Sequence, residues 1–226
     1  MPASEATEAP IPIFPLSNVV LFPGLSTPLH LFEPRYRQLA QDVLSGGRRI
    51  GMVVVRPEFA EEMSGDPPIF PIGCAGFVTQ HHRLPDGRHN IVLQGEYRFR
   101  VIEEPPRPAE RLYRTARIER LEDPYADTDR ERVSRLRASI AQDVGVIVRK
   151  TQPERADALR SGLFDGVDDV TFVNLLCNAF ALPVEDKQAL LEADAIGERY
   201  ARLASVLSFQ RAEIEAARDP GANRLH

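Results

Sequence analysis

The pattern of hydrophobic and polar residues over positions 11–55 predicts two strands, a helix and a third strand, in that order. Prolines interrupt the first apolar run, between Ile11 and Leu16. Because proline cannot donate a hydrogen bond to a ladder, we expect this strand at a sheet edge or a bulge. A second apolar run covers 28–32. Residues 50–55 are almost all apolar, which predicts a core strand that is covered on both faces.

A helix is predicted between the second and third strands. Pro34 stands where the first turn of a helix tolerates a missing N–H. Apolar residues then recur at intervals of three and four and form one stripe. The stripe consists of Tyr36, Leu39, Ala40, Val43 and Leu44. We expect Gly46 or Gly47 to take the left-handed conformation that ends the helix.

Strand-like patterns continue over residues 73–121. We predict strands at 73–82, 89–94, 97–101 and 113–121, with a tight hairpin connection over 84–88. Gly95 is expected at a bulge or a close approach of two backbones. Arg98 and Arg100 alternate with apolar residues, so we expect both arginines on the open face of a half-buried strand. About six mostly antiparallel strands with one crossover helix predict a small β pseudo-barrel.

The apolar spacing becomes helical after a proline-bearing joint at 124–126. Thr128 and Glu131 have the spacing of a capping box, ahead of a stripe that reaches about residue 149. Further helices are predicted over 153–162, from a cap at Asp168 to Leu182-Pro183, and over 184–193 and 194–217. The predicted domains are a disordered tail (1–10), a β-barrel (11–123), a helical bundle (127–218) and a second tail (219–226). The fold class is therefore α+β.

Composition and charge limit the classes of partner. The chain has 226 residues, 43% of them hydrophobic, and a formal net charge of −5. Acidic residues outnumber basic ones on both sides of Ala126, so nucleic acid and anionic membranes are not expected partners. No apolar run approaches the roughly 18 to 20 residues of a membrane helix. The two cysteines, Cys74 and Cys177, lie in unrelated apolar contexts, which predicts reduced core thiols in a soluble, cytoplasmic protein.

Several unusual motifs occur in a fixed order. They are PIFPL, LFPG and PLHLFEPRY before the predicted helix, then LPDG, GEYRFRV and LED, and finally LP, EDKQALLE and an ER pair at 198–199. In this order they resemble the N-terminal substrate-binding domain of Lon-type proteases, over about residues 11–215. The resemblance implies a barrel similar to PUA domains followed by helices. It also implies a stand-alone member without the ATPase and protease domains, because those proteases continue where this chain ends.

Motifs for ATP hydrolysis and proteolysis are missing from the sequence. A phosphate-binding loop needs a lysine beside a glycine, and neither Lys150 nor Lys187 has one. Neither lysine lies in a motif that would activate a serine. We therefore expect no catalytic residues, no enzymatic activity and no cofactor.

Histidines near one hairpin are the remaining candidates for a metal site. His82 and His89 could be neighbours across the hairpin, whereas His81 is expected on the opposite face of its strand. Two ligands are fewer than the three that proteins usually give to zinc, so we expect a solvated hairpin and no metal. His30, between Leu29 and Leu31, is expected to be a hydrogen-bonded strand residue rather than a catalytic base.

The resemblance implies a non-enzymatic module that binds unfolded or partner polypeptides and has a link to a protease system. An RNA-binding function is the alternative, because PUA domains bind RNA; an enzyme whose site assembles across both parts is a third class. Leu21, Phe22 and Leu25 flank a Pro-Gly turn next to the proline-interrupted edge. They are the candidate peptide-binding residues if exposed, and barrel core if buried.

Overall fold

The structure is a computed structural model that describes residues 9–155, 164 and 166–216. Its strands are β1 (Ile11–Leu16), β2 (Ser26–Leu31), β3 (Arg49–Val54), β4 (Ile72–Arg83), β5 (His89–Glu103) and β6 (Thr115–Arg120). Its α-helices are α1 (Pro34–Ser45), α2 (Arg130–Thr151), α4 (Asp169–Ala179), α5 (Val184–Glu192) and α6 (Ile196–Ala216). The predicted terminal tails, except residues 9 and 10, and most of the predicted helix at 153–162 lie outside the described residues.

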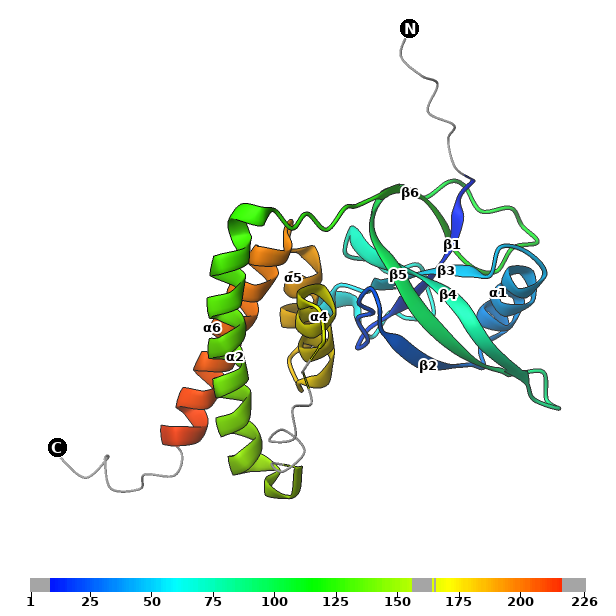
Figure 1. Cartoon of the computed structure of the whole chain (residues 1–226). Helices are drawn as coiled ribbons and strands as arrows, with labels where there is room; N and C mark the ends of the chain where they lie inside the picture. Colours follow the sequence, from blue (N-terminus) through cyan, green and yellow to red (C-terminus); the bar gives the residue numbers. More distant parts are fainter. Residues whose placement is uncertain (1–8, 156–163, 165, 217–226) are drawn as a thin grey trace, which may run out of the picture. The chain divides into compact units, whose positions relative to one another are not determined.

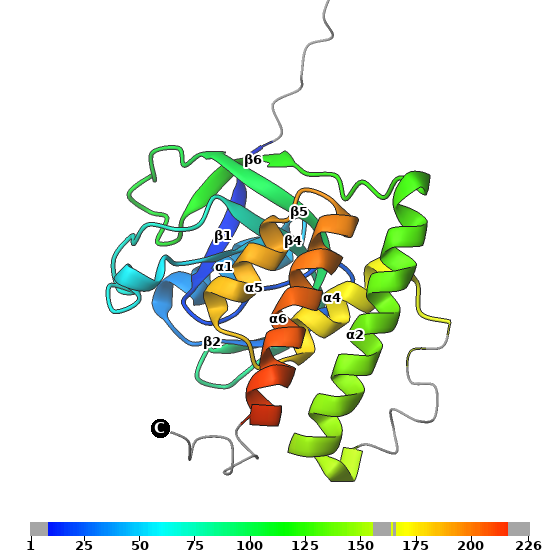
Figure 2. The ribbon, with the colours of Figure 1, turned by 90° about the vertical axis from the view of Figure 1, so that its left-hand side faces the viewer.

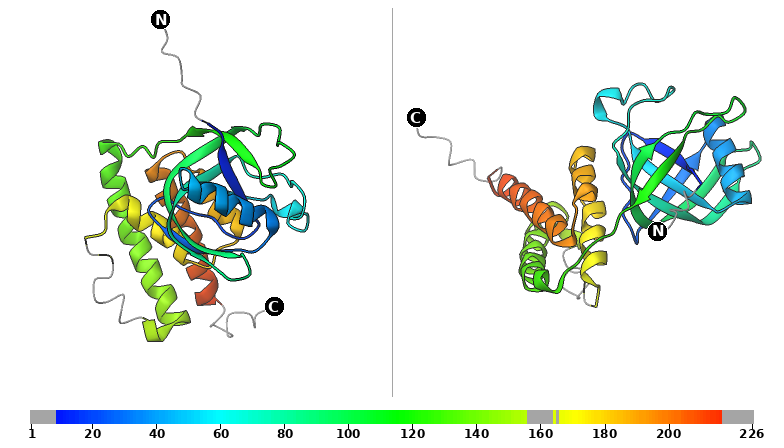
Figure 3. Two further views of the ribbon diagram at one scale, coloured as in Figure 1. Left: turned by 90° about the vertical axis from the view of Figure 1, so that its right-hand side faces the viewer. Right: turned by 90° about the horizontal axis from the view of Figure 1, so that it is seen from above.

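The six strands form one sheet that closes on itself. Their order is β2-β5-β4-β3-β1-β6, and β5 also pairs with β6, so five strands complete a barrel and β2 extends it on one side (Figure 1). The connection from β2 to β3 passes through α1, which lies across one end of the barrel (Figure 3). The predicted α+β class and the barrel with one crossover helix are confirmed.

Strand β5 holds the sheet together because it pairs with three other strands. Its first half pairs with β2, its second half with β6, and β4 runs along both halves. The sequence analysis divides this segment into two strands at Gly95. In the structure the strand is continuous, but one residue, Glu96, is bulged between the pairs Gly76–Gly95 and Ala75–Tyr97. The predicted irregularity at Gly95 is therefore a β-bulge.

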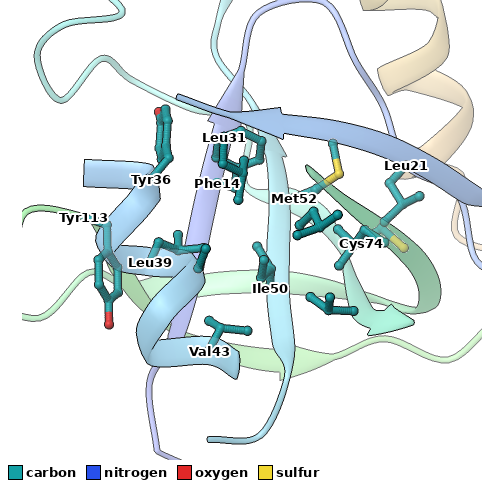
Figure 4. Packing of buried hydrophobic residues seen from close by; sticks show 14 residues of the cluster. Phe14, Leu21, Leu31, Tyr36, Leu39, Val43, Ile50, Met52, Cys74 and Tyr113 are labelled. Atoms are coloured by element: carbon teal, nitrogen blue, oxygen red, sulfur yellow. The ribbon is translucent and has the colours of Figure 1, made fainter. Parts of the chain in front are cut away.

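The apolar stripe of α1 packs into the larger of two hydrophobic clusters in the barrel unit. This cluster contains Tyr36, Leu39, Ala40 and Val43 of α1 with side chains from β1, β3, β4 and β5 (Figure 4). Ile50 and Met52 of β3 belong to this cluster, whereas Val53 belongs to the second one. Both faces of β3 are therefore covered, as its continuous apolar sequence predicts.

Helix α1 begins as predicted but ends differently. Pro34 occupies its first turn, and the amide N–H of Gly46 donates to the Val43 carbonyl. Neither Gly46 nor Gly47 is left-handed; Arg48 is, with φ 57°. The prediction of a left-handed glycine is wrong. The Arg48 amide also donates to Val43, and its guanidinium donates to the Val78 carbonyl at 3.1 Å, contacts that offset the strain of this conformation.

A Pro-Gly turn connects β1 to β2 and is bonded to the bulge in β5. The Leu25 N–H donates to the Phe22 carbonyl at 3.2 Å, and Gly24 has φ 83°. Proline at the second position and a left-handed glycine at the third are typical of a type II turn. Gly24 N–H donates to Gly95 O at 2.9 Å, and Gly95 N–H donates to Leu25 O at 2.8 Å. The turn is therefore held to β5 by two backbone hydrogen bonds.

The chain divides into two compact units that are not continuous in sequence. The barrel unit contains the chain up to Glu122 together with Asn178–Glu192. The helical unit contains Asp123–Cys177 and the chain from Ala193 onward. The sequence analysis assigns 178–192 to the helical bundle, but within the barrel unit Gln188 of α5 donates to the Ile72 carbonyl at 2.9 Å.

In the helical unit, α2 and α6 run side by side (Figures 1 and 2). Arg211 of α6 donates to Asp143 of α2 at 2.9 Å. Asp168 accepts the Thr171 N–H at 2.9 Å, so the predicted cap of α4 is confirmed. The predicted capping box at Thr128 is wrong, because Asp127–Asp129 forms a 3-10 turn and no side chain caps α2.

Each unit contains a buried arginine that bonds to a residue next to the first crossing of the chain. Arg98 is 2% exposed, and its guanidinium donates to the carbonyls of Leu191 and Glu122, both at 2.9 Å. In the helical unit, Arg199 is fully buried and donates to Asp123 Oδ1 at 2.8 Å and to Asn174 Oδ1 at 2.7 Å. The prediction that Arg98 faces solvent is wrong, because its guanidinium donates hydrogen bonds to backbone carbonyl groups in the interior.

Replacing Gly95 with valine should destabilise the barrel unit. A Cβ at this position would collide with the Phe22 carbonyl group, coming within 3.0 Å of its carbon. Backbone atoms cannot turn aside as a side chain can, so we expect a loss of about 1–3 kcal/mol in the free energy of unfolding. Gly47→Val is the matched control, because nothing lies within 4 Å of a Cβ there. Urea unfolding of both variants measures the difference, and equal losses would contradict it.

Arg98→Met should destabilise the protein far more than Arg100→Met, although both arginines belong to the same strand. Arg98 is buried, whereas the Arg100 side chain is 50% exposed and lies 4.0 Å from Glu119. Loss of Arg98 leaves the buried Leu191 carbonyl without its donor. We expect a loss of about 2–4 kcal/mol for Arg98→Met and under about 0.5 kcal/mol for Arg100→Met, measured by urea unfolding. A small loss for both would show that Arg98 is dispensable.

Candidate functional site

Strand β2, the second half of β4 and the first half of β5 form a three-stranded arm of the sheet. We define the arm as residues 26–31 and 78–94, which includes the β4–β5 turn (Figure 1). His30 of β2 is opposite Asn90 of β5, which is opposite His82 of β4. Residues in register point to the same face of a sheet, so these three side chains form a row. Pro28, Val92 and Gln80 form the next row on this outer face.

A groove of about 440 Å³ runs across this outer face. Pro28, His30, Gln80, His82, Asn90 and Val92 line it from this face, and Leu29, His81 and Ile91, which alternate with them along the strands, also border it. The lining combines apolar side chains, carboxamides and imidazoles, and it contains no carboxylate. Such a mixed surface can hold an extended chain through both apolar contacts and hydrogen bonds.

Hydrogen bonds within the groove define the state of His30. Its Nδ1 lies 2.6 Å from Asn90 Oδ1, and Arg88 Nη1 lies 3.3 Å from its Nε2. A guanidinium can only donate, so Nε2 accepts and Nδ1 carries the proton that is donated to Asn90. The prediction that His30 is a hydrogen-bonded strand residue is confirmed. Arg88 also pairs with Asp86 at 2.6 Å.

The outer edge of the arm carries unpaired backbone. Among the described strands, β2 pairs only with β5, so its other edge faces no strand. Phe32 follows β2 directly and is 57% exposed. Its ring stacks with His30 at a centroid distance of 5.9 Å. An exposed aromatic residue therefore lies at the end of a strand edge whose N–H and C=O groups can pair with another chain.

The opposite face of the arm carries a second pair of histidines. His81 Nε2 lies 2.8 Å from His89 Nδ1, and the two rings stack. His89 is 2% exposed, and its Nε2 has no hydrogen-bond partner among the described residues. Burial lowers the pKa of both imidazoles; Arg48 lowers that of His81 further, and His81 lowers that of His89. The prediction that His82 and His89 are neighbours is wrong, because His82 lies on the outer face.

No metal centre is assembled from these histidines. Within the part of the chain that the structure describes, no three His, Cys, Asp or Glu residues are grouped to hold a metal ion. The helices of the same part include none that is long and apolar enough to cross a membrane.

The predicted peptide-binding residues lie beside the Pro-Gly turn, next to the start of β2. Leu21 is 3% exposed and packs in the larger core cluster with Met52 and Cys74 (Figure 4). Phe22 is fully buried, whereas Leu25 is partly exposed. Leu21 and Phe22 are thus core side chains in this structure, and the peptide-binding role of the three residues stays a prediction. The groove itself was not predicted, because it needs the register of three strands that are distant in sequence.

The family model described as the ATP-dependent protease La (LON) substrate-binding domain matches residues 10–208. The chain belongs to this family. Among Lon relatives, the protease of Cytophaga hutchinsonii is 27% identical over 209 residues, and that of Amoebophilus asiaticus is 31% identical over 174 residues. These matches cover 92% and 76% of the chain but only 25% and 20% of the relatives. The chain thus spans about a quarter of the length of the Lon proteases that it matches.

Solved Lon structures have the same fold. The N-terminal domain of the Mycobacterium avium complex Lon protease superposes with a TM-score of 0.67 at 14% identity, covering 88% of this chain and 98% of that one. A Lon N-terminal domain protein from Xanthomonas campestris gives 0.56 at 21% identity, covering 89% and 98%. In this Lon family member, three residues of the recognised motifs take part in hydrogen bonds of the two buried arginines, each within its own unit: Arg98 in the barrel unit, and Asp123 and Arg199 in the helical unit.

Acid should destabilise the arm through His81 and His89. Both pKa values lie below the ordinary 6.5, so the unfolded chain binds protons more readily than the folded one. Stability is therefore full above about pH 6.5 and is lost as the pH falls through the lower, folded-state pKa values. We expect the melting temperature to fall less between about pH 7 and 5 in His81→Gln/His89→Gln than in the parent. His82→Gln is the control, and an unchanged slope in the double variant would contradict the assignment.

Proposed function

We propose that this protein binds extended polypeptide segments along the free edge of β2 and the adjoining groove, without a chemical step of its own. The observation that carries the proposal is the β2 edge, which among the described strands pairs on one side only and ends at the exposed Phe32. An incoming strand can bond to such an edge through its backbone, and nearby side chains supply selectivity. The substrate-binding family supports a polypeptide ligand, because the substrates of a protease are polypeptides.

The surroundings of the two lysines support a non-catalytic role. Lys187 Nζ donates to the Asn178 carbonyl at 3.0 Å, and Lys150 lies 4.0 Å from Glu215. A lysine that activates a nucleophile must instead lose its proton in an apolar or cationic setting. We place the function in the cytoplasm, because Cys74 and Cys177 are buried and not joined as a disulfide.

The arrangement of charges favours polypeptide over RNA. Outside residues 26–31 and 78–94, six arginines of the barrel unit each lie within 4.0 Å of a carboxylate: Arg35 with Glu33, Arg49 with Glu96, Arg100 with Glu119, Arg107 with Asp66, Arg114 with Glu104, and Arg117 with Glu103. RNA binding depends on cations that neutralise phosphates. Arginines that already face carboxylates are poorly suited to that role.

Phe32→Ser should weaken capture of an unfolded protein. The matched control is Ile102→Ser, because Ile102 is 60% exposed on β5 and lies outside the arm. Loss of an aromatic anchor typically exceeds about 1 kcal/mol, so we expect roughly fivefold to tenfold weaker binding for Phe32→Ser and little change for Ile102→Ser. Fluorescence anisotropy with labelled, reduced and carboxymethylated α-lactalbumin measures the affinity, and thermal melting checks the fold.

Equal affinities for the two variants would place the binding surface elsewhere. The same titration includes a single-stranded RNA as competitor. Displacement of the labelled protein by RNA at comparable concentration would favour the RNA-binding alternative over the proposed function.

A further inference from the structure

We propose that the groove on the outer face of the arm prefers polypeptide segments that carry carboxylates, so that acidic extended chains are its ligands. The inference rests on the polypeptide-binding function proposed above and names the class of chain that this site selects. Four observations about the arm carry it: its charge balance, the lining of the groove, the hydrogen bonds of the lining side chains, and the pairing of its one acid.

The arm differs in charge from the rest of the chain. The protein has 33 acidic residues and a net charge of −5, yet the arm contains one acid, Asp86, and two arginines, Arg83 and Arg88. Four of the five histidines also lie on the arm. Two more arginines lie near the His81–His89 pair on its other face: the Arg48 guanidinium donates to Val78, and the Arg37 guanidinium lies next to Gly87. The arm is therefore a cationic region of an acidic protein.

Several hydrogen-bond donors lie in the groove. Asn90 Oδ1 already accepts from His30, which leaves the two amide N–H groups of Asn90 to bond to a ligand. The Gln80 carboxamide and the His82 imidazole lie in the lining as well, and both carry N–H groups. Carboxylates accept hydrogen bonds and cannot donate them, so their chemistry complements these groups.

The one acid of the arm is already engaged. Asp86 accepts from the Arg88 backbone N–H at 3.1 Å and from its guanidinium at 2.6 Å. The backbone bond and the guanidinium lower the pKa of Asp86, which keeps it ionised in this pair. A lysine or arginine of a ligand would therefore lie near Arg88 with no free carboxylate to pair with. The preference for acidic over basic polypeptides therefore follows from this mismatch as much as from the attraction of acidic side chains.

The test compares three fluorescein-labelled peptides of equal length that share alternating valines and differ in the residues between them, which are glutamate, glutamine or lysine. Anisotropy titrations use the full chain at neutral pH. We expect the glutamate peptide to bind at least about fivefold more tightly than the lysine peptide, with glutamine between them. Raising the ionic strength from about 0.05 to 0.3 M should narrow this ratio.

Two variants test whether the preference for the glutamate peptide depends on Arg88. Arg88→Gln removes a positive charge and releases Asp86, so the ratio of glutamate to lysine affinities should fall toward one. Arg100→Gln, an exposed arginine on the other half of β5, should leave the ratio unchanged. Equal binding of all three peptides would overturn the charge preference while leaving the proposed function intact. No binding of any peptide by the folded protein would overturn both.

Discussion

The approach of the Phe22 carbonyl to Gly95 is the constraint on which the arm depends. A side chain at this point in β5 would push the Pro-Gly turn away, and the two backbone hydrogen bonds between turn and strand would break. Those bonds place Leu25 beside Gly95, and the register from Ser26–Gln94 to Leu31–His89 follows one residue later. The absence of one Cβ thus determines where β2 begins, and with it which side chains line the groove.

Periodicity predicted most elements of the fold because each depends on local sequence. The continuous apolar run of β3, Pro34 at the start of α1 and Asp168 at the start of α4 are confirmed by contacts within a few residues. Arg98 was misplaced because burial of a charge depends on distant carbonyls, those of Leu191 and Glu122, which no local pattern reveals. The register next to the hairpin turn explains the histidines: Arg83 pairs with His89 and His82 with Asn90, so His81, two residues before Arg83, shares a face with His89 and His82 does not.

The two faces of the arm have different chemistry although they share the same strands. On the outer face, polar side chains bond across the strands near open space and leave donors free. On the inner face, His81 and His89 bond to each other next to the apolar core, close to Arg37, Arg48 and Arg83 and without a carboxylate among those neighbours. Side chains alternate between the two faces along all three strands. The outer face is therefore suited to ligand contact, whereas the inner face holds a histidine pair that resists protonation.

The division into two units has a consequence for how this chain can be shortened. The chain crosses between units three times: after Glu122, after Cys177 and after Glu192. A fragment that stops at the first crossing would lose α5 and, with it, the Leu191 carbonyl that Arg98 holds and the amide that Gln188 gives to Ile72. No single cut separates the barrel from the helices with both intact, so fusion or recombination at residue 122 transfers an incomplete barrel. Exchange between relatives must instead carry the whole of 11–192.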